Sequence, residues 1–188
     1  MSALFVISYV ALWALVIFQS IVLVGLVRAL ARLQQRGAQV DGPIDHHDHL
    51  AGREAPEFSA TDLSGRLVRA SEFAGRPRAF LFVSPECRTC RLTLSEMNAL
   101  EWKAEGTVVV ICQSGRSECR ALAERFDLEA PVLVDEDAAI SDLFAVNGVP
   151  TAVLVTADDQ IASYGQPMRG EELDEMLRDG DRAALEQA

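Results

Sequence analysis

The chain has 188 residues and a formal net charge of −11, and 49% of its residues are apolar while 24% are charged. This length allows one domain of ordinary size with an appended segment, and the apolar fraction is too high for a disordered chain. An acidic balance with no Lys/Arg cluster in the globular part of the sequence argues against nucleic-acid binding, so we expect no nucleic-acid partner.

The first 27 residues carry no charged side chain, and Arg28, Arg32 and Arg36 follow them. A helix needs about 20 apolar residues to cross a bilayer, so residues 1–36 are predicted to form a transmembrane anchor with a basic flank. A cleaved signal peptide is the alternative, because residues 29–31 (Ala-Leu-Ala) have the form of a cleavage site. Such peptides have a basic start and a shorter apolar core, so we favour a retained anchor.

Residues 37–53 are predicted to be a flexible linker, because they contain three Gly and one Pro and have no apolar periodicity. All three histidines of the chain, His46, His47 and His49, lie in this segment. A metal site needs ligands on a rigid frame, so we expect a solvated linker, with no metal and no cofactor.

Residues 54–179 are predicted to form one α/β domain, and residues 180–188 a C-terminal tail. Strands that alternate with helices imply right-handed βαβ units and a partly parallel sheet with an antiparallel edge. Apolar runs and turn residues predict strands at 57–61, 67–70, 78–84, 107–112, 132–134, 151–156 and 161–164. Helical patterns are found at 87–105, 116–127, 138–145 and 171–178.

Cys87 and Cys90 form a Cys-x-x-Cys motif at the point where a buried strand passes into a helix, a setting typical of redox chemistry. At the helix N-terminus, Cys87 faces free backbone N–H groups and the positive end of the helix dipole, which lowers a thiol pKa below its ordinary value of about 8.5. We therefore predict that Cys87 is the exposed nucleophile and Cys90 the partly covered resolving thiol. Arg88 is expected to favour the Cys87 thiolate, and Glu86 to oppose it.

The other two cysteines, Cys112 and Cys119, are separated by six residues, which is not the spacing of a zinc knuckle. Cys112 ends a predicted strand, at the sheet edge where α/β active sites lie. Cys119 lies on the apolar stripe of the next helix. Two interpretations are open: a second redox pair that relays electrons to the Cys-x-x-Cys motif, or buried, inert thiols. A purely structural bridge within Cys-x-x-Cys itself would add little stability, because it closes so short a loop.

Val149, Pro150 and Thr151 stand where the third strong strand begins, and a proline there belongs to an edge or a special turn. With the preceding Cys-x-x-Cys and the closing hairpin and helix, this order resembles the thioredoxin fold. The resemblance implies a mixed central sheet with flanking helices and an N-terminal β-hairpin extension. It also implies a cis Pro150 beside the disulfide and a substrate-docking role for Val149, Pro150 and Thr151, with the Val149 backbone pairing with the substrate chain.

The opening of the domain, residues 53–58 (Arg-Glu-Ala-Pro-Glu-Phe), and the turn at 62–65 (Asp-Leu-Ser-Gly) are similar to the redoxin branch of this fold. With the N-terminal span and the Ser-Pro-x-Cys-x-x-Cys site, the chain most resembles MauD-type maturation proteins, alongside the TlpA-like reductases. The resemblance implies a thiol–disulfide oxidoreductase that reduces, forms or isomerises disulfides in maturing proteins. Its substrate would be the methylamine dehydrogenase small subunit in a MauD-like role, or a cytochrome c or copper-site protein in a TlpA-like role.

The same resemblance implies a single-pass protein of the inner membrane with a periplasmic catalytic domain. A membrane-embedded thiol protein would then donate or accept its electrons. The three arginines at positions 28–36, taken alone, favour a cytoplasmic C-terminus, but a long following domain is translocated largely regardless of charge. We therefore give the resemblance more weight than the arginine count.

Glu86 stands where this fold usually has Trp, and Thr89 where Pro is often found. Both positions tune the reduction potential, so the direction of electron flow is left open. A peroxidase of the peroxiredoxin branch is one alternative, but Phe80 and Ser84 occupy the places of Pro and Thr in the Pro-x-x-x-Thr-x-x-Cys pattern. A thioredoxin-fold metal chaperone is another alternative. Such chaperones resemble a Cys-x-x-x-Cys pattern with a His inside the domain, whereas this chain has Cys-x-x-Cys and no His after residue 49.

Overall fold

The computed structural model describes residues 50–104 and 106–187 and four residues nearer the N-terminus: Tyr9, Leu12, Trp13 and Gln19. The chain divides into two compact units, Met1–Gly42 and Pro43–Ala188. Apart from those four residues, the anchor predicted at 1–36 lies outside the described part, as do linker residues 37–49 with the three histidines. Within the described residues, no helix combines the length and apolar character that a membrane crossing needs.

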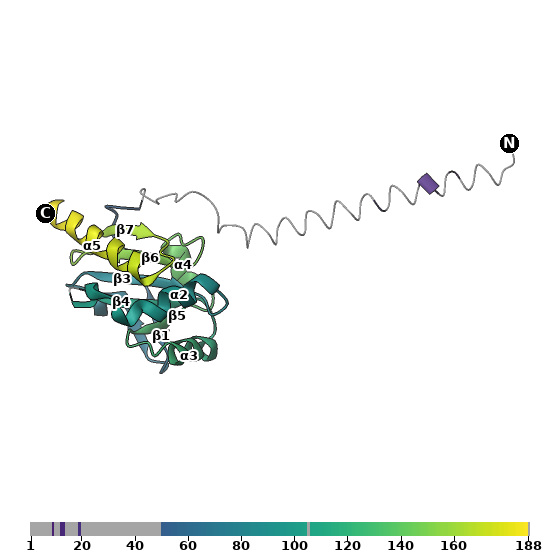
Figure 1. Ribbon diagram of the computed structural model, residues 1–188, viewed down its shortest axis with the longest axis horizontal. Coiled ribbons are helices and arrows are strands. Elements are labelled where there is room, and N and C mark those ends of the chain that lie inside the picture. The colour runs from purple at the N-terminus through teal and green to yellow at the C-terminus, as the bar shows by residue number, and fades with distance from the viewer. Residues whose placement is uncertain (1–8, 10–11, 14–18, 20–49, 105, 188) are drawn as a thin grey trace. The chain divides into compact units, whose positions relative to one another are not determined.

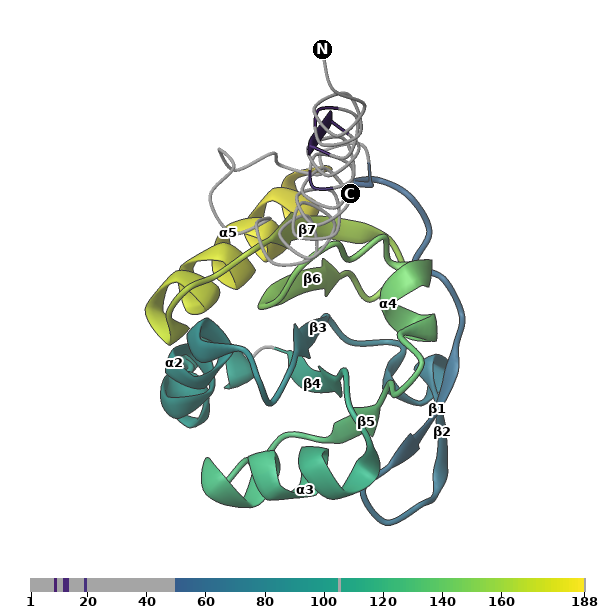
Figure 2. The ribbon, with the colours of Figure 1, turned by 90° about the vertical axis from the view of Figure 1, so that its right-hand side faces the viewer.

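The second unit is built on a seven-stranded mixed sheet in the order β2-β1-β5-β4-β3-β6-β7, part of which is labelled in Figure 1 and all of which is labelled in Figure 2. β3, β4 and β5 are parallel neighbours, whereas β6 is antiparallel to both β3 and β7, and β1 is antiparallel to both β2 and β5. The predicted hairpin extension and antiparallel edge are therefore both present. The strands are β1 (Ser59–Asp62), β2 (Leu67–Arg69), β3 (Arg78–Val83), β4 (Thr107–Cys112), β5 (Val132–Val134), β6 (Thr151–Val155) and β7 (Ile161–Gly165).

Helices cover both faces of the sheet, with α2, α3 and α5 on one face and α4 on the other (Figure 2). α2 and α3 are the crossovers between parallel strands, as the alternation of strands and helices predicts. The helices are α2 (Arg88–Glu96), α3 (Arg116–Arg125), α4 (Ala139–Leu143) and α5 (Gly170–Gln187), with 3₁₀ turns at Ala70–Phe73, Met97–Ala99 and Glu101–Ala104.

β3 lies at the centre of the core, because all six of its residues are buried. Side chains alternate along a strand, so Leu81 and Val83 pack under α2 and α3, while Phe80 and Phe82 pack on the opposite face. On that face Phe144 contacts both phenylalanines, with ring centroids 5.4 and 5.6 Å away. The apolar run thus forms a strand buried on both sides, as predicted.

The helix predicted at 87–105 ends at Glu96, and two 3₁₀ turns follow it. Leu100 adopts an extended backbone between them, and Trp102 is fully buried. A continuous helix would rotate a large side chain by about 100° per residue. The change of conformation lets Met97, Leu100 and Trp102 all reach the core on the same side.

At the C-terminus the prediction was too short, because α5 continues through residues 180–187, which were expected to form a tail. Gly180, a residue that usually weakens a helix, lies inside α5 against the sheet. A Cβ atom there would come within 2.7 Å of Leu154 and 2.8 Å of Ser163. Glycine is therefore needed at this position for the close approach of helix and sheet.

The end of the predicted linker also belongs to the domain. Leu50 is buried, the Gly52 N–H donates to the Ile161 carbonyl (2.8 Å), and the Ile161 N–H donates to the Arg53 carbonyl (2.8 Å). These bonds join segments far apart in the sequence, so composition alone did not predict them.

Candidate active site

Cys87 is the N-cap residue of α2, directly after the loop that leaves the buried strand β3. Its sulfur is bonded to that of Cys90, with the two Cα atoms 5.3 Å apart. The backbone N–H of Cys90 also points at the Cys87 sulfur, at 3.0 Å. Cys87 is half-buried, whereas Cys90 is fully buried. An attacking thiolate from outside therefore reaches the sulfur of Cys87 first.

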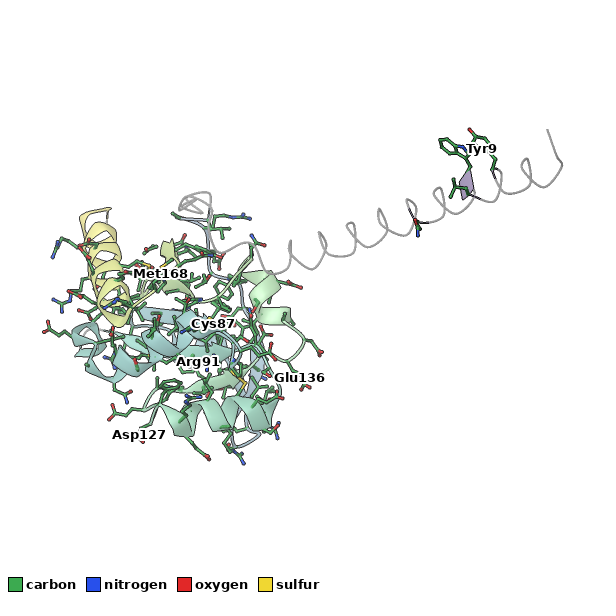
Figure 3. All side chains as sticks on the ribbon, turned by 45° about the vertical axis from the view of Figure 1, so that its right-hand side comes forward. Tyr9, Cys87, Arg91, Asp127, Glu136 and Met168 are labelled. Carbon is green, nitrogen blue, oxygen red and sulfur yellow. A yellow bond between two sulfur atoms is a disulfide. The ribbon has the colours of Figure 1, made fainter. Side chains whose placement is uncertain are left out.

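The loop before β6 lies beside this disulfide. The Val149–Pro150 peptide bond is cis, as the resemblance implied. The Cys87 sulfur is 3.4 Å from the carbonyl oxygen of Val149, which is half-buried, while Pro150 is buried. Figure 3 shows Cys87 at the start of α2, with Arg91 one turn further along the helix. The fold thus brings the Cys-x-x-Cys motif and the predicted docking loop together.

Thr151 was predicted to bind substrate, but its side chain is fully buried. Its hydroxyl donates to the carbonyl of Gly148 (2.6 Å), so the side chain holds the loop in place. Tyr164, which the sequence analysis missed, does the same from β7 by donating its hydroxyl to the carbonyl of Ala145 (3.2 Å). Burial raises the pKa of Tyr164 to about 12, against the opposing effect of its hydrogen bond with Thr151. A buried tyrosine needs a hydrogen-bond partner for its hydroxyl, so a tyrosine in a predicted buried strand is the sequence feature that could have indicated this role.

The predicted tuning residues stand around the cysteine pair. Glu86 and Arg88 are exposed on either side of Cys87, and Thr89 is half-buried. The Thr89 carbonyl accepts a hydrogen bond from the Thr93 hydroxyl (3.5 Å) within α2. Any effect of Glu86 and Arg88 on the sulfur therefore acts through their charge, which solvent and salt screen.

Cys112 and Cys119 are also bonded to one another, with Cα atoms 5.9 Å apart. Both are fully buried, and they join the end of β4 to α3. The interpretation that they are free, inert thiols is therefore wrong. Sequence spacing did not decide between a bonded pair and free thiols, because only the packing of α3 onto the sheet brings its first turn back to the end of β4.

A buried carboxylate organises the same edge of the sheet. Asp135, only 4% exposed, accepts hydrogen bonds from the N–H groups of Ile140 and Ser141 (both 2.9 Å) and from the Ser141 hydroxyl (2.6 Å). The Gln113 side chain donates to that hydroxyl (2.7 Å). This network fixes the start of α4, and an Asp placed between a strand and a helix is the signal that predicts such a cap. In the part of the chain that the structure describes, no three His, Cys, Asp or Glu side chains are grouped so as to hold a metal ion.

The AhpC/TSA family matches residues 51–164, which is more than half of the chain and includes the whole cysteine site. The chain belongs to the AhpC/TSA family. This membership confirms the redoxin resemblance seen in the sequence.

Two relatives give the reaction class. The methylamine utilization protein MauD of Paracoccus denitrificans is 29% identical over 189 aligned positions, covering 98% of this chain and 92% of MauD. The thiol-disulfide oxidoreductase ResA of Bacillus thuringiensis is 26% identical over 132 positions, covering 68% of this chain and 75% of ResA. Together with the bonded Cys87–Cys90 pair, they identify this AhpC/TSA family member as a thiol–disulfide oxidoreductase whose substrate carries a disulfide.

A solved structure confirms the fold. The crystal structure of a protein described as the thiol:disulfide interchange protein DsbE from Chlorobium tepidum superposes with a TM-score of 0.64 at 24% sequence identity. The superposition covers 72% of this chain and 97% of that one. The domain of this AhpC/TSA family member therefore has the thioredoxin-like fold.

Proposed function

We propose that this enzyme is a membrane-tethered thiol–disulfide oxidoreductase that reduces, forms or isomerises disulfides in extracytoplasmic proteins during their maturation. One observation carries the proposal: a half-buried Cys87 sulfur, bonded to a fully buried Cys90, lies 3.4 Å from the backbone carbonyl of Val149 in the proposed docking loop. The likeness to MauD extends over 98% of the chain, including its apolar N-terminal segment.

In the reducing direction, the Cys87 thiolate attacks one sulfur of a substrate disulfide, and the other substrate sulfur leaves as a thiolate. The Cys90 N–H, 3.0 Å from the Cys87 sulfur, is placed to stabilise the attacking thiolate. The Cys90 thiolate then attacks the Cys87 sulfur and releases the second substrate thiolate. Two electrons have passed to the substrate, and the enzyme holds a disulfide that a membrane-embedded thiol protein reduces. Oxidation of a substrate dithiol follows the same steps in reverse.

The proposed docking surface is the loop of residues 148–150 next to the Cys87–Cys90 disulfide. A substrate segment that extends along residues 148–150 finds a backbone acceptor at Val149 next to the reactive sulfur. Main-chain hydrogen bonds of this kind are independent of side-chain identity, so recognition of the substrate's sequence must come from the exposed surroundings. A MauD-like role makes the substrate a methylamine dehydrogenase small subunit, and a TlpA-like role makes it a cytochrome c or copper-site protein.

One feature supports a membrane anchor, and another supports an extracytoplasmic location for the domain. The first 27 residues carry no charge, which suits a membrane anchor. The fully buried Cys112–Cys119 disulfide is of a kind that forms and persists in oxidising compartments and is rare in the cytosol. The proposed location is therefore the periplasmic side of the inner membrane, with a single span.

The proposal is tested by trapping in the native host. Cys90→Ser leaves the attacking thiol without its resolving partner, so mixed disulfides with substrate proteins should accumulate and disappear when the gel is run with reductant. Cys87→Ser is the matched control and should trap nothing. Equal trapping by the two variants would show that the nucleophile is assigned wrongly.

The location is tested separately in intact cells. A membrane-impermeant maleimide should label Cys87 of the Cys90→Ser variant from outside the inner membrane. Labelling that requires lysis of the inner membrane would place the domain in the cytoplasm and reject the proposed location. Turnover of hydrogen peroxide by the wild-type chain, at rates above those with disulfide substrates, would instead favour a peroxidase.

A further inference from the structure

We propose that the Cys112–Cys119 disulfide is a permanent structural cross-link that stays closed during catalysis and fastens α3 to the active-site edge of the sheet. The proposal is independent of which substrate the enzyme uses and of the direction in which electrons flow. It assigns different chemistry to two disulfides that lie in one domain: Cys87–Cys90 opens in each turnover, and Cys112–Cys119 does not.

Access to the sulfur atoms differs between the pairs. Thiol–disulfide exchange requires a thiolate to reach a sulfur atom directly. Cys87 is half-buried and open to such attack, whereas Cys112 and Cys119 are both 0% exposed. Leu122 and Ala123 of α3 are buried in the same apolar cluster. A substrate or reductant in solution therefore meets only the first pair while the domain is folded.

The position of the cross-link explains what it holds. Cys112 is the last residue of β4, in register with Val83 of β3 on one side and Val134 of β5 on the other. Its carbonyl oxygen accepts hydrogen bonds from the N–H groups of Ser114 (3.0 Å) and Asp135 (2.9 Å). The cross-link therefore anchors α3 at the point where two neighbouring parallel strands end.

The loop that the disulfide closes is connected to both sides of the active site. The Gln113 N–H donates to the carbonyl of Val83 (2.8 Å), the last residue of the strand that leads to Cys87. The Gln113 side chain donates to Ser141 of α4, the helix that precedes the docking loop. Opening the disulfide would remove the covalent link between α3 and the end of β4, while the Gln113 hydrogen bonds to Val83 and Ser141 still hold the loop at the active-site edge.

Formation of the cross-link is a two-electron oxidation. The two thiols lose two protons and two electrons as the S–S bond forms, and a disulfide-bearing oxidant takes them up and becomes a dithiol. Burial of both sulfur atoms on folding then shields the bond from the reductant that serves Cys87–Cys90.

Native-state alkylation of the full wild-type chain tests the proposal directly. The protein is treated with increasing dithiothreitol, the thiols are alkylated without denaturant, and labelled peptides are identified by mass spectrometry. We expect a label on Cys87 over a reductant range in which Cys112 and Cys119 stay unlabelled, whereas Cys90, which is as fully buried as they are, should stay unlabelled until the chain unfolds. After unfolding in the same reductant, all four cysteines should be labelled. Labelling of Cys112 or Cys119 together with Cys87 in the folded protein would overturn the proposal and indicate an electron relay.

Paired variants separate the two roles. In Cys112→Ala/Cys119→Ala the loop-closure constraint is lost, so the melting temperature should fall by roughly 5–10 °C. Its turnover of insulin disulfides, measured well below that temperature, should stay within about twofold of wild type. The control Cys87→Ser/Cys90→Ser should lose turnover entirely, and its remaining disulfide should resist reductant until the chain unfolds. An unchanged melting temperature, or loss of turnover in the folded Cys112→Ala/Cys119→Ala variant, would contradict a purely structural role.

Discussion

The sulfur of Cys87 lies 3.4 Å from the carbonyl oxygen of Val149, a residue 62 positions further along the chain. The contact places a backbone hydrogen-bond acceptor directly beside the atom that exchanges bonds. A substrate chain that pairs with this backbone is held with its own disulfide close to Cys87, which converts an encounter into a positioned reaction. The fold thus places the backbone that is proposed to bind the substrate next to the sulfur that reacts with it.

The charges next to Cys87 should tune its reactivity in opposite directions. Charges near a helix N-terminus contribute about 0.3–1 kcal/mol, or roughly a twofold to fivefold change in rate. In the Cys90→Ser background at neutral pH and low salt, Arg88→Ala should slow alkylation of Cys87 by iodoacetamide by about that factor, and Glu86→Gln should accelerate it. Arg125→Ala, at the far end of α3, is the control and should have no effect. Differences that persist in 1 M salt would contradict an effect through charge, because the screening length is then about 3 Å.

Tyr164 should titrate far above an ordinary tyrosine, since burial raises its pKa to about 12. The folded state then keeps its proton longer than the unfolded state, so its contribution to stability is complete below about pH 10 and is lost as the pH rises towards 12. Absorbance at 295 nm, measured as the difference between wild type and Tyr164→Phe, isolates this one tyrosinate. The difference signal should develop near pH 12, and a midpoint near 10 would show that the hydroxyl is not held in the folded protein.

Removing only the carboxylate of the Arg78–Asp159 ion pair should destabilise the domain more than removing the arginine. Arg78 is 2% exposed and Asp159 is 42% exposed, so the guanidinium is the desolvated partner. Asp159→Asn removes the negative charge that faces this buried cation, whose neighbours are the Thr156 carbonyl (3.3 Å) and the Phe80 ring, and should lower the free energy of unfolding by about 2–3 kcal/mol. Arg78→Met removes the buried charge and should cost about 1 kcal/mol or less. Urea unfolding measures both, and the double variant should match Arg78→Met. The opposite order would contradict the assignment.

Gly180→Ala should destabilise the domain although alanine is the better helix former. The gain in helix propensity is about 1 kcal/mol, whereas overpacking against a buried side chain costs about 1–3 kcal/mol. Leu154 is 1% exposed and has little room to move, so a net loss of about 1 kcal/mol is expected in urea unfolding. Asp179→Ala, on an exposed position of the same helix, is the control and should be neutral or slightly stabilising. A stabilised Gly180→Ala would show that helix and sheet separate easily here.

Much of the fold was predictable because its signals are local. The apolar run of β3 is buried on both faces and leads into a helix that begins with Cys87 as its N-cap, as strand and helix patterns indicate. Sequence patterns gave the wrong helix ends where contacts with segments distant in the chain decide the conformation. The helix from Cys87 ends early so that Trp102 is buried, and α5 passes through Gly180 because the sheet lies against it.

The sequence by itself determined the reactive pair and its setting, since two cysteines three positions apart at a helix start are neighbours in any packing of the rest. Only the tertiary structure decided that Cys112 and Cys119 are bonded to each other and that the Thr151 side chain points inward. It also showed that Tyr164 holds the docking loop. The reason is physical: these contacts depend on how helices and strands distant in the chain pack on one sheet, and side-chain periodicity carries no information about which distant partner a buried group will meet.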